Sequence, residues 1–324
     1  MSGMMRVKSV AAACTMLAFA GGAVAQEWPA KSVSVLVPTA AGGNTDIMAR
    51  LASEHLNKKF GQPFVVQNRP SAGGVLTSHQ VSTADPDGYT VLFAPNSMVL
   101  LTPLVQPINF DPAKLVPVTN VGTGSQVAAV KRELPVNTLT EFVAHAKANA
   151  GKLNFTTAGV NNISHLGPVL LFKMAGLELA HVAARGEPAA VTDLISGNVD
   201  FYFGNTSVLL ATDQTKIKLL AVGSAKRLEA APNIPTVAES YPGFVFESWN
   251  GFFVPAGTPD AIQDRMRSAI AEFVGTPEIR QRLLTLGITP GGQSKAEVTS
   301  AFKSHTESFA AAVAAAGIKK PEAK

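Results

Sequence analysis

Two stretches of this sequence combine glycine and asparagine with the start of an apolar helix pattern, and both could bind a small anion. The first is VSVLVPTAAGGNTDIMAR, residues 33–50, where an apolar run stops at Pro38 and a loop with Gly42 and Gly43 follows. The second is LNFTTAGVNNISHLG, residues 153–167. Backbone N–H groups in such loops and at a helix N-terminus attract negative charge without any lysine. Two loops of this kind that face each other would hold a carboxylate between them.

The candidate ligand-binding residues come from the loops that follow the expected strands. In an open α/β sheet the ligand lies at the carboxyl ends of the strands, so these loops belong together. Their side chains are mostly neutral hydrogen-bonding or small groups, and Arg185 adds one guanidinium. The predicted site comprises Thr39, Ala40, Ala41, Gly42, Gly43, Asn44, Asp46, Asn96, Ser97, Thr157, Ala158, Gly159, Asn161, Ser164, His165, Arg185, Gly204, Asn205 and Thr206.

Several of these residues also have a purely structural interpretation. Gly42 and Gly43 could serve only to shape a tight turn between a strand and a helix. Asp46 would be favourable in a first helical turn because of the helix dipole alone. At least one helix N-cap is expected among Asn161, Asn162 and Ser164. Packing or a surface position is the alternative for His165 and Arg185.

The sequence lacks the motifs of common catalytic and cofactor sites. It has no G-x-S-x-G elbow and no Walker loop, and Gly122-Thr123-Gly124 lacks the third glycine of a dinucleotide fingerprint. Acidic residues do not cluster in the strand-end loops, and His55, His79 and His145 show no paired metal-ligand spacing. We therefore expect a binding protein without catalytic residues, metal or cofactor.

The elements that would position these loops alternate along the chain. Thr138-Leu139-Thr140-Glu141 fits a capping box, and Gly61, Gly151 and Gly176 are expected helix ends. Such alternation is typical of an α/β fold in which helices cover parallel sheets. Strands are expected at 33–37, 63–67, 89–94, 153–156, 179–182, 199–203 and 218–222, and helices at 46–60, 74–83, 162–175 and 188–196.

The order of these elements predicts two domains. The chain leaves the first domain near residue 122 and returns near residue 249, through the strand-like run FVFESWNGFFVPAG. Three helical stretches end the chain, one of them opened by a capping box at Ser294 to Glu297. We predict a discontinuous domain 1 (26–122 and 249–324), a domain 2 (123–248) and a hinge with two crossings.

The N-terminus has the pattern of a secretory signal peptide, residues 1–25. Arg6 and Lys8 precede a short apolar stretch, and Ala23-Val24-Ala25 is an A-x-A cleavage site. The apolar stretch is too short to span a bilayer. The only cysteine, Cys14, lies inside this signal in a poor acylation context, so the mature chain would have no disulfide. We expect an exported, periplasmic protein.

Composition argues against nucleic acid as a partner. Removal of Arg6 and Lys8 from the 27 basic residues leaves 25 against 23 acidic residues, close to neutrality. Aromatic residues are 7% of the chain and no basic cluster interleaves with them. Nearly 300 mature residues with 46% apolar content are ample for two cores.

Several long motifs in order give the chain a specific resemblance to a known family. They are WPAKSVSVLVPTAAGGNTDIMAR, GQPFVVQNRPSAGG, ADPDGYTVLFA, GKLNFTTAG with the following SHL, DLISGNVDF, NIPTVAES and SWNGFFVPAGTP. Over essentially the whole mature chain it resembles the periplasmic substrate-binding proteins of tripartite tricarboxylate transporters, the Bug family. The resemblance implies a two-domain, Venus-flytrap (type II) α/β binding protein with the ligand between its lobes.

The resemblance also implies how a ligand is held. Members bind small carboxylates, including di- and tricarboxylates, acidic amino acids and aromatic acids. The loop from Thr39 to Asn44 would grip a carboxylate, partly through ordered water, and the loop from Thr157 to Ser164 would close from the other lobe. The implied partners are a small carboxylate and a membrane permease, and the chain is expected to be a monomer.

Two departures from the family pattern bear on the ligand. Members commonly carry His-Val-Pro-Tyr-Lys-Gly where this chain has His181-Val182-Ala183-Ala184-Arg185-Gly186, and Asp-Asn where it has Gly204-Asn205. The missing tyrosine and acid predict a larger pocket without a negative charge for an ammonium group. The resulting hypothesis is an aromatic dicarboxylate such as terephthalate, held between the Gly42-Gly43 loop and groups among Asn205, Thr206, Arg185 and Ser97.

Two other functions remain open at this point. One is a liganded form that addresses a membrane sensor instead of a permease. The other is a secreted enzyme that acts on a carboxylate.

Overall fold

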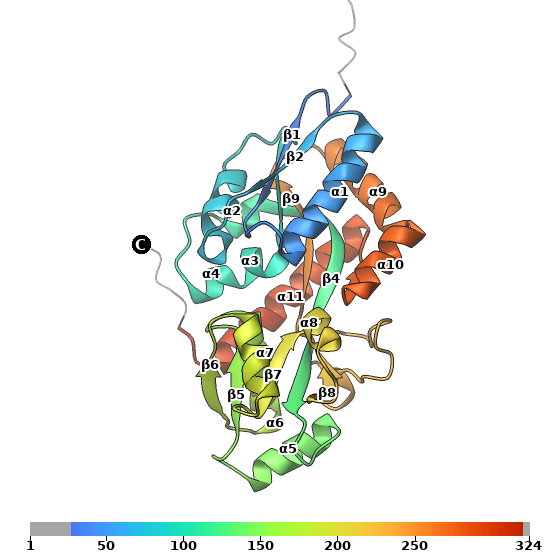
Figure 1. Cartoon of the computed structure of the whole chain (residues 1–324). Coiled ribbons are helices and arrows are strands. Elements are labelled where there is room, and N and C mark those ends of the chain that lie inside the picture. Colours follow the sequence, from blue (N-terminus) through green and yellow to red (C-terminus); the bar gives the residue numbers. More distant parts are fainter. Residues whose placement is uncertain (1–26, 320–324) are drawn as a thin grey trace, which may run out of the picture.

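The computed structural model describes residues 27–319, which form two lobes joined by long strands and one helix (Figure 1). The predicted signal peptide and Cys14 lie outside the described residues. Each lobe has its own part of a mixed sheet, with helices on both faces. The predicted α/β, two-domain fold is confirmed.

The first lobe combines the N-terminal part of the chain with segments that follow residue 246. It contains β1 (Val33–Val37), α1 (Asn44–Phe60), β2 (Phe64–Asn68), α2 (Val75–Ser82), β3 (Thr90–Pro95), α3 (Asn96–Leu100), α4 (Thr102–Val105), β4 (Leu115–Lys131), β9 (Glu247–Pro255), α9 (Asp260–Gly275), α10 (Pro277–Thr285) and β10 (Ile288–Pro290). The strand order is β2-β1-β3-β9-β4. β1 is parallel to β2 and β3, so these three strands end at the same edge of the sheet.

The second lobe is built from the middle of the chain. It contains α5 (Leu139–Ala148), β5 (Asn154–Thr157), α6 (Ile163–Ala175), β6 (Ala180–Ala183), α7 (Glu187–Ile195), β7 (Phe201–Asn205), α8 (Thr206–Ala211) and β8 (Ile217–Val222). β5 lies between β6 and β7 and is parallel to both. In Figure 1 the arrow of β7 points toward the first lobe, so its carboxyl end lies between the lobes.

β4 and β9 are the two strands that cross between the lobes. β4 pairs with β9 from Leu115 to Ser125, and from Gln126 onward it pairs with β7 and β8 of the second lobe. The change of partner occurs within a few residues of the crossings expected near 122 and 249. One continuous strand is therefore shared by the two parts of the sheet.

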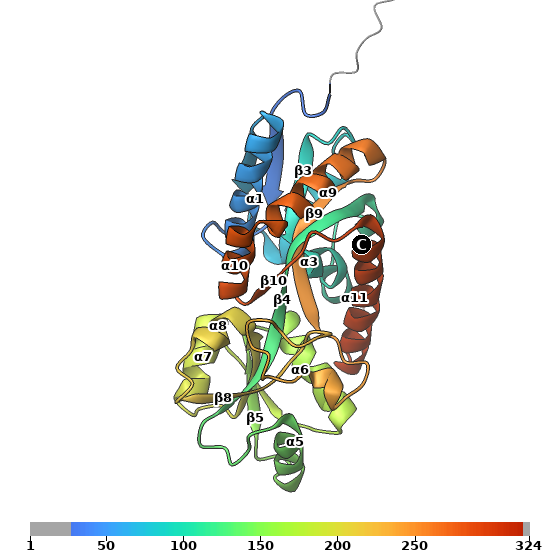
Figure 2. The same cartoon turned by 90° about the vertical axis from the view of Figure 1, so that its right-hand side faces the viewer.

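The C-terminal helix α11 (Lys295–Ala315) contacts both lobes. Its Val298 packs in a core cluster of the first lobe, whereas Phe309, Ala312 and Val313 pack in the core of the second. Figure 2 shows α11 running along one side of the molecule past both lobes. The predicted domain 1 includes all of residues 249–324. In the structure, however, the apolar end of α11 packs against α6 of the second lobe. α11 is a third connection between the lobes.

The helix boundaries follow local chemistry that the sequence displays. Capping boxes begin α5 at Thr138 and α11 at Ser294, as predicted. Gly61 and Gly176 end α1 and α6 in the left-handed conformation, also as predicted. α5 ends at Ala148, before the expected stop at Gly151.

Three short helices were not predicted, and one of them, α4 of four residues, follows α3 after a single residue. α3 and α8, of five and six residues, begin directly where β3 and β7 end. Such short helices contain too few turns to show a 3.6-residue apolar period. α3 and α8 lie at the carboxyl edges of the sheets, and α3 forms part of the site described next.

Candidate functional site

A cavity of about 440 Å³ lies between the lobes, at the carboxyl ends of β3, β5 and β7. Its first-lobe wall comes from the segment around Gly73 and from α3 and α4. Its second-lobe wall comes from β4, the β5–α6 loop, α7 and β7. The lining residues are Gly73, Ser97, Met98, Leu101, Thr102, Val105, Gln106, Gln126, Ala158, Val160, Asn161, Asn162, Ile163, Ser164, Glu187, Tyr202 and Asn205.

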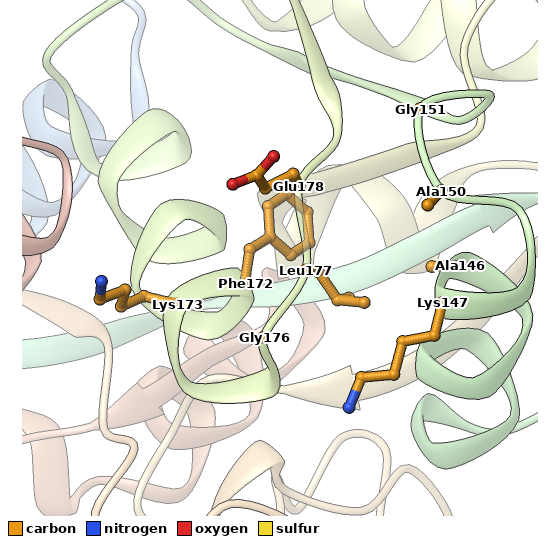
Figure 3. A pocket seen from close by; sticks show the side chains of 9 residues that line it. All are labelled: Ala146, Lys147, Ala150, Gly151, Phe172, Lys173, Gly176, Leu177 and Glu178. Atoms are coloured by element: carbon orange, nitrogen blue, oxygen red, sulfur yellow. The ribbon is translucent and has the colours of Figure 1, made fainter.

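Two somewhat larger hollows lie elsewhere in the molecule. One of about 590 Å³ lies between α8 and α10, and one of about 530 Å³ lies between α5 and α6. Figure 3 shows the second of these: the side chains of Lys147 and Lys173 point to different sides, and Glu178 points away from both. Because its charged groups do not converge on one point, we favour the interlobe cavity despite its smaller volume.

The Gly42-Gly43 loop begins α1 without a side-chain cap. Gly43 occupies the N-cap position, and no side chain accepts a hydrogen bond from the first turn. The segment from Ala40 to Gly43 is exposed, and the amino end of α1 faces the second lobe (Figure 1). The hydroxyl Oγ1 of Thr39 is buried and has no hydrogen-bond partner within residues 27–319. This loop therefore keeps N–H and hydroxyl donors for a ligand or water.

Asp46 has a structural role in this loop. Its Oδ2 accepts hydrogen bonds from the N–H of Gly42 at 2.9 Å and from Nε of Arg50 at 3.0 Å, while Oδ1 accepts from Asn68 at 2.9 Å. Burial alone would raise the pKa of Asp46, but these hydrogen bonds outweigh it and lower the pKa below its usual value. Asp46 thus holds the loop against the helix, and it removes the Gly42 N–H from the set of free donors.

The β5–α6 loop satisfies most of its polar groups internally. Oδ1 of Asn162 accepts hydrogen bonds from the N–H groups of Ser164 and His165 and from the Ser164 hydroxyl. The Ser164 hydroxyl in turn accepts from the N–H of Ala158, and Asn161 adopts a left-handed φ of 58°. Asn162 is the N-cap that the sequence expected among three candidates.

His165 packs against the fold rather than presenting a charge. Its ring stacks on His181 with centroids 4.5 Å apart, and Nδ1 accepts the N–H of Asn161. Burial, with a smaller effect of His181, lowers the pKa of His165 to about 4. The ring is therefore neutral near pH 7 and does not attract an anion by charge.

A partly buried acid, Glu187, lies in the second-lobe wall. Its Oε1 accepts hydrogen bonds from the N–H of Asn205 at 2.8 Å and from the hydroxyl of Tyr202 at 3.3 Å. Burial raises the pKa of Glu187, and these two hydrogen bonds partly oppose the rise. Burial also raises the pKa of Tyr202, with further contributions from the Glu187 charge and hydrogen bond.

This arrangement corrects our interpretation of Gly204. The missing side chain does not enlarge the pocket, because a Cβ at Gly204 would overlap the ring of Tyr202. The pocket also does not lack a negative charge, since Glu187 supplies a carboxylate from the start of α7. The sequence comparison considered only the position of the lost acid and missed an acid that another element brings to the same wall.

Two further predicted residues have their side chains engaged by the fold. Asn96 is fully buried and hydrogen-bonds to His305 of α11, to Ser248 and to the backbone of Trp249. Thr206 is also buried and donates to the carbonyl of Ser125 at 2.8 Å. Both residues join the crossing strands to their lobes.

Some of the predicted site residues line the cavity and others lie outside its wall. Those in the wall are Ser97, Ala158, Asn161, Ser164 and Asn205. Those outside it are Thr39, Ala40, Ala41, Gly42, Gly43, Asn44, Asp46, Asn96, Thr157, Gly159, His165, Arg185, Gly204 and Thr206. The role of the Thr39–Asn44 loop in ligand binding stays a prediction.

The sequence analysis missed several residues of the wall. Met98 lies on α3 and Thr102 on α4, two short helices that it did not predict, and Leu101 lies between them. Tyr202 stands inside a strand, where an aromatic residue usually indicates core. Glu187 was visible in a strand-end loop, and its position beside Gly186 was the available signal.

Across residues 27–319, no group of three or more His, Cys, Asp or Glu side chains is arranged to hold a metal ion. In the same range, no helix is both long and apolar enough to cross a bilayer.

Comparisons with known proteins agree with this architecture. A family model for the tripartite tricarboxylate transporter family receptor, TctC, matches residues 48–311. A UPF0065 protein from the tcbD-tcbE intergenic region of Pseudomonas sp. strain P51 is 32% identical over 284 residues, 86% of this chain and 84% of the relative. A second UPF0065 protein, from Bordetella bronchiseptica, is 32% identical over 300 residues, 92% of this chain and 89% of the relative.

Solved structures show the same similarity. R. palustris Rpa4515 with adipate has a TM-score of 0.75 and 28% identity, covering 90% of this chain and 99% of that chain. MatC from Rhodopseudomonas palustris with bound malate has a TM-score of 0.70 and 26% identity, covering 88% and 99%. The periplasmic binding protein BugD has a TM-score of 0.70 and 28% identity, covering 91% and 100%.

These matches confirm the resemblance seen in the sequence motifs. The chain belongs to the tripartite tricarboxylate transporter receptor family, whose members are periplasmic substrate-binding receptors rather than enzymes.

Proposed function

We propose that this protein is an extracytoplasmic solute-binding protein that captures a small carboxylate between its lobes and delivers it to a tripartite tricarboxylate transporter permease. The observation that carries the proposal is the interlobe cavity, whose wall offers neutral hydrogen-bonding groups from both lobes at the strand ends. Adipate and malate in the neighbouring structures support a carboxylate ligand. Export to the periplasm is part of the proposal, because the signal peptide lies outside the described residues.

Binding would work through lobe closure. β4, β9 and α11 connect the lobes, so a ligand that contacts both walls stabilises the closed arrangement relative to the open one. The permease would then recognise the closed form. Delivery rests on family membership, and a pull-down of the permease with and without ligand tests it.

Terephthalate remains a candidate only as a member of the carboxylate class. Its arguments were the space expected from the missing tyrosine at Ala184 and the missing acid at Gly204. Ala184 is not among the residues that line the cavity, and the ring of Tyr202 fills the space at Gly204. Met98, Leu101 and Ile163 nevertheless give the wall apolar surface suited to the carbon skeleton of a larger acid.

The experiment is a thermal-shift screen followed by calorimetric titration. The panel contains adipate, malate, terephthalate and L-glutamate, with 1,6-hexanediol as a control that matches adipate but lacks its carboxylates. Binding of at least one carboxylate and not of the diol is expected. A ligand at about 100 times its dissociation constant should stabilise the folded form by about 2.7 kcal/mol.

A pair of variants locates the site. Ala158→Phe fills the interlobe cavity, whereas Ala150→Phe fills the hollow between α5 and α6 (Figure 3). Loss of binding in the first variant alone supports the proposal. Loss of binding in Ala150→Phe alone would place the site in the hollow between α5 and α6. Recovery of the bound ligand in chemically altered form would indicate an enzyme.

A further inference from the structure

We propose that Glu187 makes this receptor select carboxylates that also carry an ammonium group, with the ammonium directed to the second lobe. This inference rests on the proposed function, because it assigns the ligand class of the same cavity. It reverses the preference for purely anionic ligands that the loss of an acid at position 204 had suggested.

The carboxylate of Glu187 is held in a fixed orientation. Glu187 is the first residue of α7, and Pro188 follows it in the first helical turn. Both hydrogen bonds described for its side chain end on Oε1, one from the backbone of Asn205 and one from the hydroxyl of Tyr202. Oε2 is thereby left for a donor from the cavity. A preoriented acceptor of this kind loses little conformational freedom when a ligand binds.

The cavity wall offers this carboxylate no positive charge. No Lys, Arg or His is among the described residues that line the cavity, and Arg185 is exposed outside it. A partly buried carboxylate without a counter-ion is costly, and burial accordingly raises the pKa of Glu187. A cationic ligand group would relieve this cost, whereas a second ligand carboxylate at the same place would increase it.

The neighbouring side chain of Gln126 adds a second hydrogen-bond acceptor to this wall. Gln126 pairs with Asn205 in the β4–β7 register and lines the cavity with only 7% of its surface exposed. Its Oε1 is buried and has no hydrogen-bond partner among residues 27–319. Two groups that can accept hydrogen bonds therefore lie close together on the second-lobe side.

The first-lobe side of the cavity has the opposite character. Ser97 contributes a hydroxyl at the start of α3, and the uncapped first turn of α1, outside this wall, presents its N–H groups toward the second lobe (Figure 1). These groups donate hydrogen bonds and suit a carboxylate. The two sides together match a ligand with a negative group at one end and a positive group farther along.

The test compares ligands that differ in the ammonium group. Calorimetric titration at pH 7.5 would use adipate, L-2-aminoadipate and 6-aminohexanoate with the wild-type protein, Glu187→Gln and Glu178→Gln. Gln at position 187 can still accept from Asn205 and Tyr202, so the fold should survive. Glu178 is an exposed acid of the α5–α6 hollow and serves as the matched control.

We expect at least one ammonium-bearing probe to bind the wild type about tenfold or more tightly than adipate, because a partly desolvated charge pair discriminates between ligands with and without the ammonium group. Glu187→Gln should abolish this preference and Glu178→Gln should preserve it. Burial raises the pKa of Glu187, so affinity for the ammonium-bearing probe should fall as the pH is lowered and protonation removes the Glu187 charge. The Gln variant should lose this dependence.

Tighter binding of adipate than of both ammonium-bearing probes would overturn the inference while leaving the proposed function intact. An unchanged ranking in Glu187→Gln would do the same. If neither these three probes nor any carboxylate of the screen binds, the proposed function fails, and this inference fails with it.

Discussion

The two glycine and asparagine loops that look alike in the sequence begin their helices in different ways. α1 begins at Gly43 with no side-chain cap, whereas α6 begins at Asn162, whose Oδ1 accepts two backbone N–H groups and a hydroxyl. The two loops are thus similar in composition but differ in whether a side chain accepts the backbone N–H groups of the first helical turn. The first loop leaves its helix N-terminus open, and the second closes its own.

The difference assigns different tasks to the two lobes. An open helix N-terminus can stabilise a carboxylate directly through its N–H groups and the helix dipole. A capped loop is instead a stiff frame that positions side chains such as Asn161 and Ser164 at the cavity wall. We infer that the first lobe binds the carboxylate and that the second lobe selects among carboxylates.

The strongest way to break this comparison is to cap α1 with a carboxylate of its own. Gly43 has φ −79° and ψ 166°, and a Cβ there would lie 3.7 Å from the carbonyl oxygen of Ala40, an ordinary contact. Gly43→Asp therefore fits, and its side chain would occupy the N–H groups of the first turn. Carboxylate affinity should fall about 10- to 100-fold, the worth of a hydrogen bond to a charged group.

Stability separates this effect from misfolding. An Asp N-cap should leave the free energy of unfolding unchanged or raise it by about a few tenths of a kcal/mol relative to Gly. Gly43→Ala, which adds a Cβ without a carboxylate, is the matched control for calorimetry and should lose less affinity. Unchanged affinity in Gly43→Asp would remove the loop from the site.

The second loop should respond in the opposite way. Asn162→Ala removes the cap of α6 and leaves its first-turn N–H groups unpaired, so the free energy of unfolding should fall by about 1–2 kcal/mol. Urea unfolding measures this loss, with the exposed Asn233→Ala as control. A stability loss no larger than that of the control would show that the two helix starts are equivalent after all.

Local sequence patterns predicted the parts of the fold that depend on near neighbours. The capping boxes at Thr138 and Ser294 and the glycine ends at Gly61 and Gly176 each involve residues only a few positions apart. The alternation of strands and helices then gave the two-domain α/β fold. These features do not require knowledge of distant contacts.

The cavity wall depended on contacts that the sequence does not display. Glu187 reaches Asn205 across the ends of two elements, and Tyr202 covers Gly204 only because both lie on one strand face. His305 lies in the C-terminal helix, yet it bonds to Asn96 across 209 positions. Tertiary packing decides whether a polar residue of a loop faces a ligand or the protein.

The smallest expected effect concerns pH, and between about pH 6.5 and 4 it should be larger for the second loop than for the first. Burial and the neighbouring His181 lower the pKa of His165 from 6.5 to about 4 in the folded state. Between these values the unfolded chain binds more protons than the folded one, so the free energy of unfolding falls as the pH drops from about 6.5 toward 4. His165→Asn should remove part of this loss, whereas Gly43→Ala should keep it. Urea unfolding at pH 7.5 and pH 5 provides the measurement. Equal pH dependence in the wild type and His165→Asn would show that the stacked histidines do not make the β5–α6 loop the acid-sensitive one.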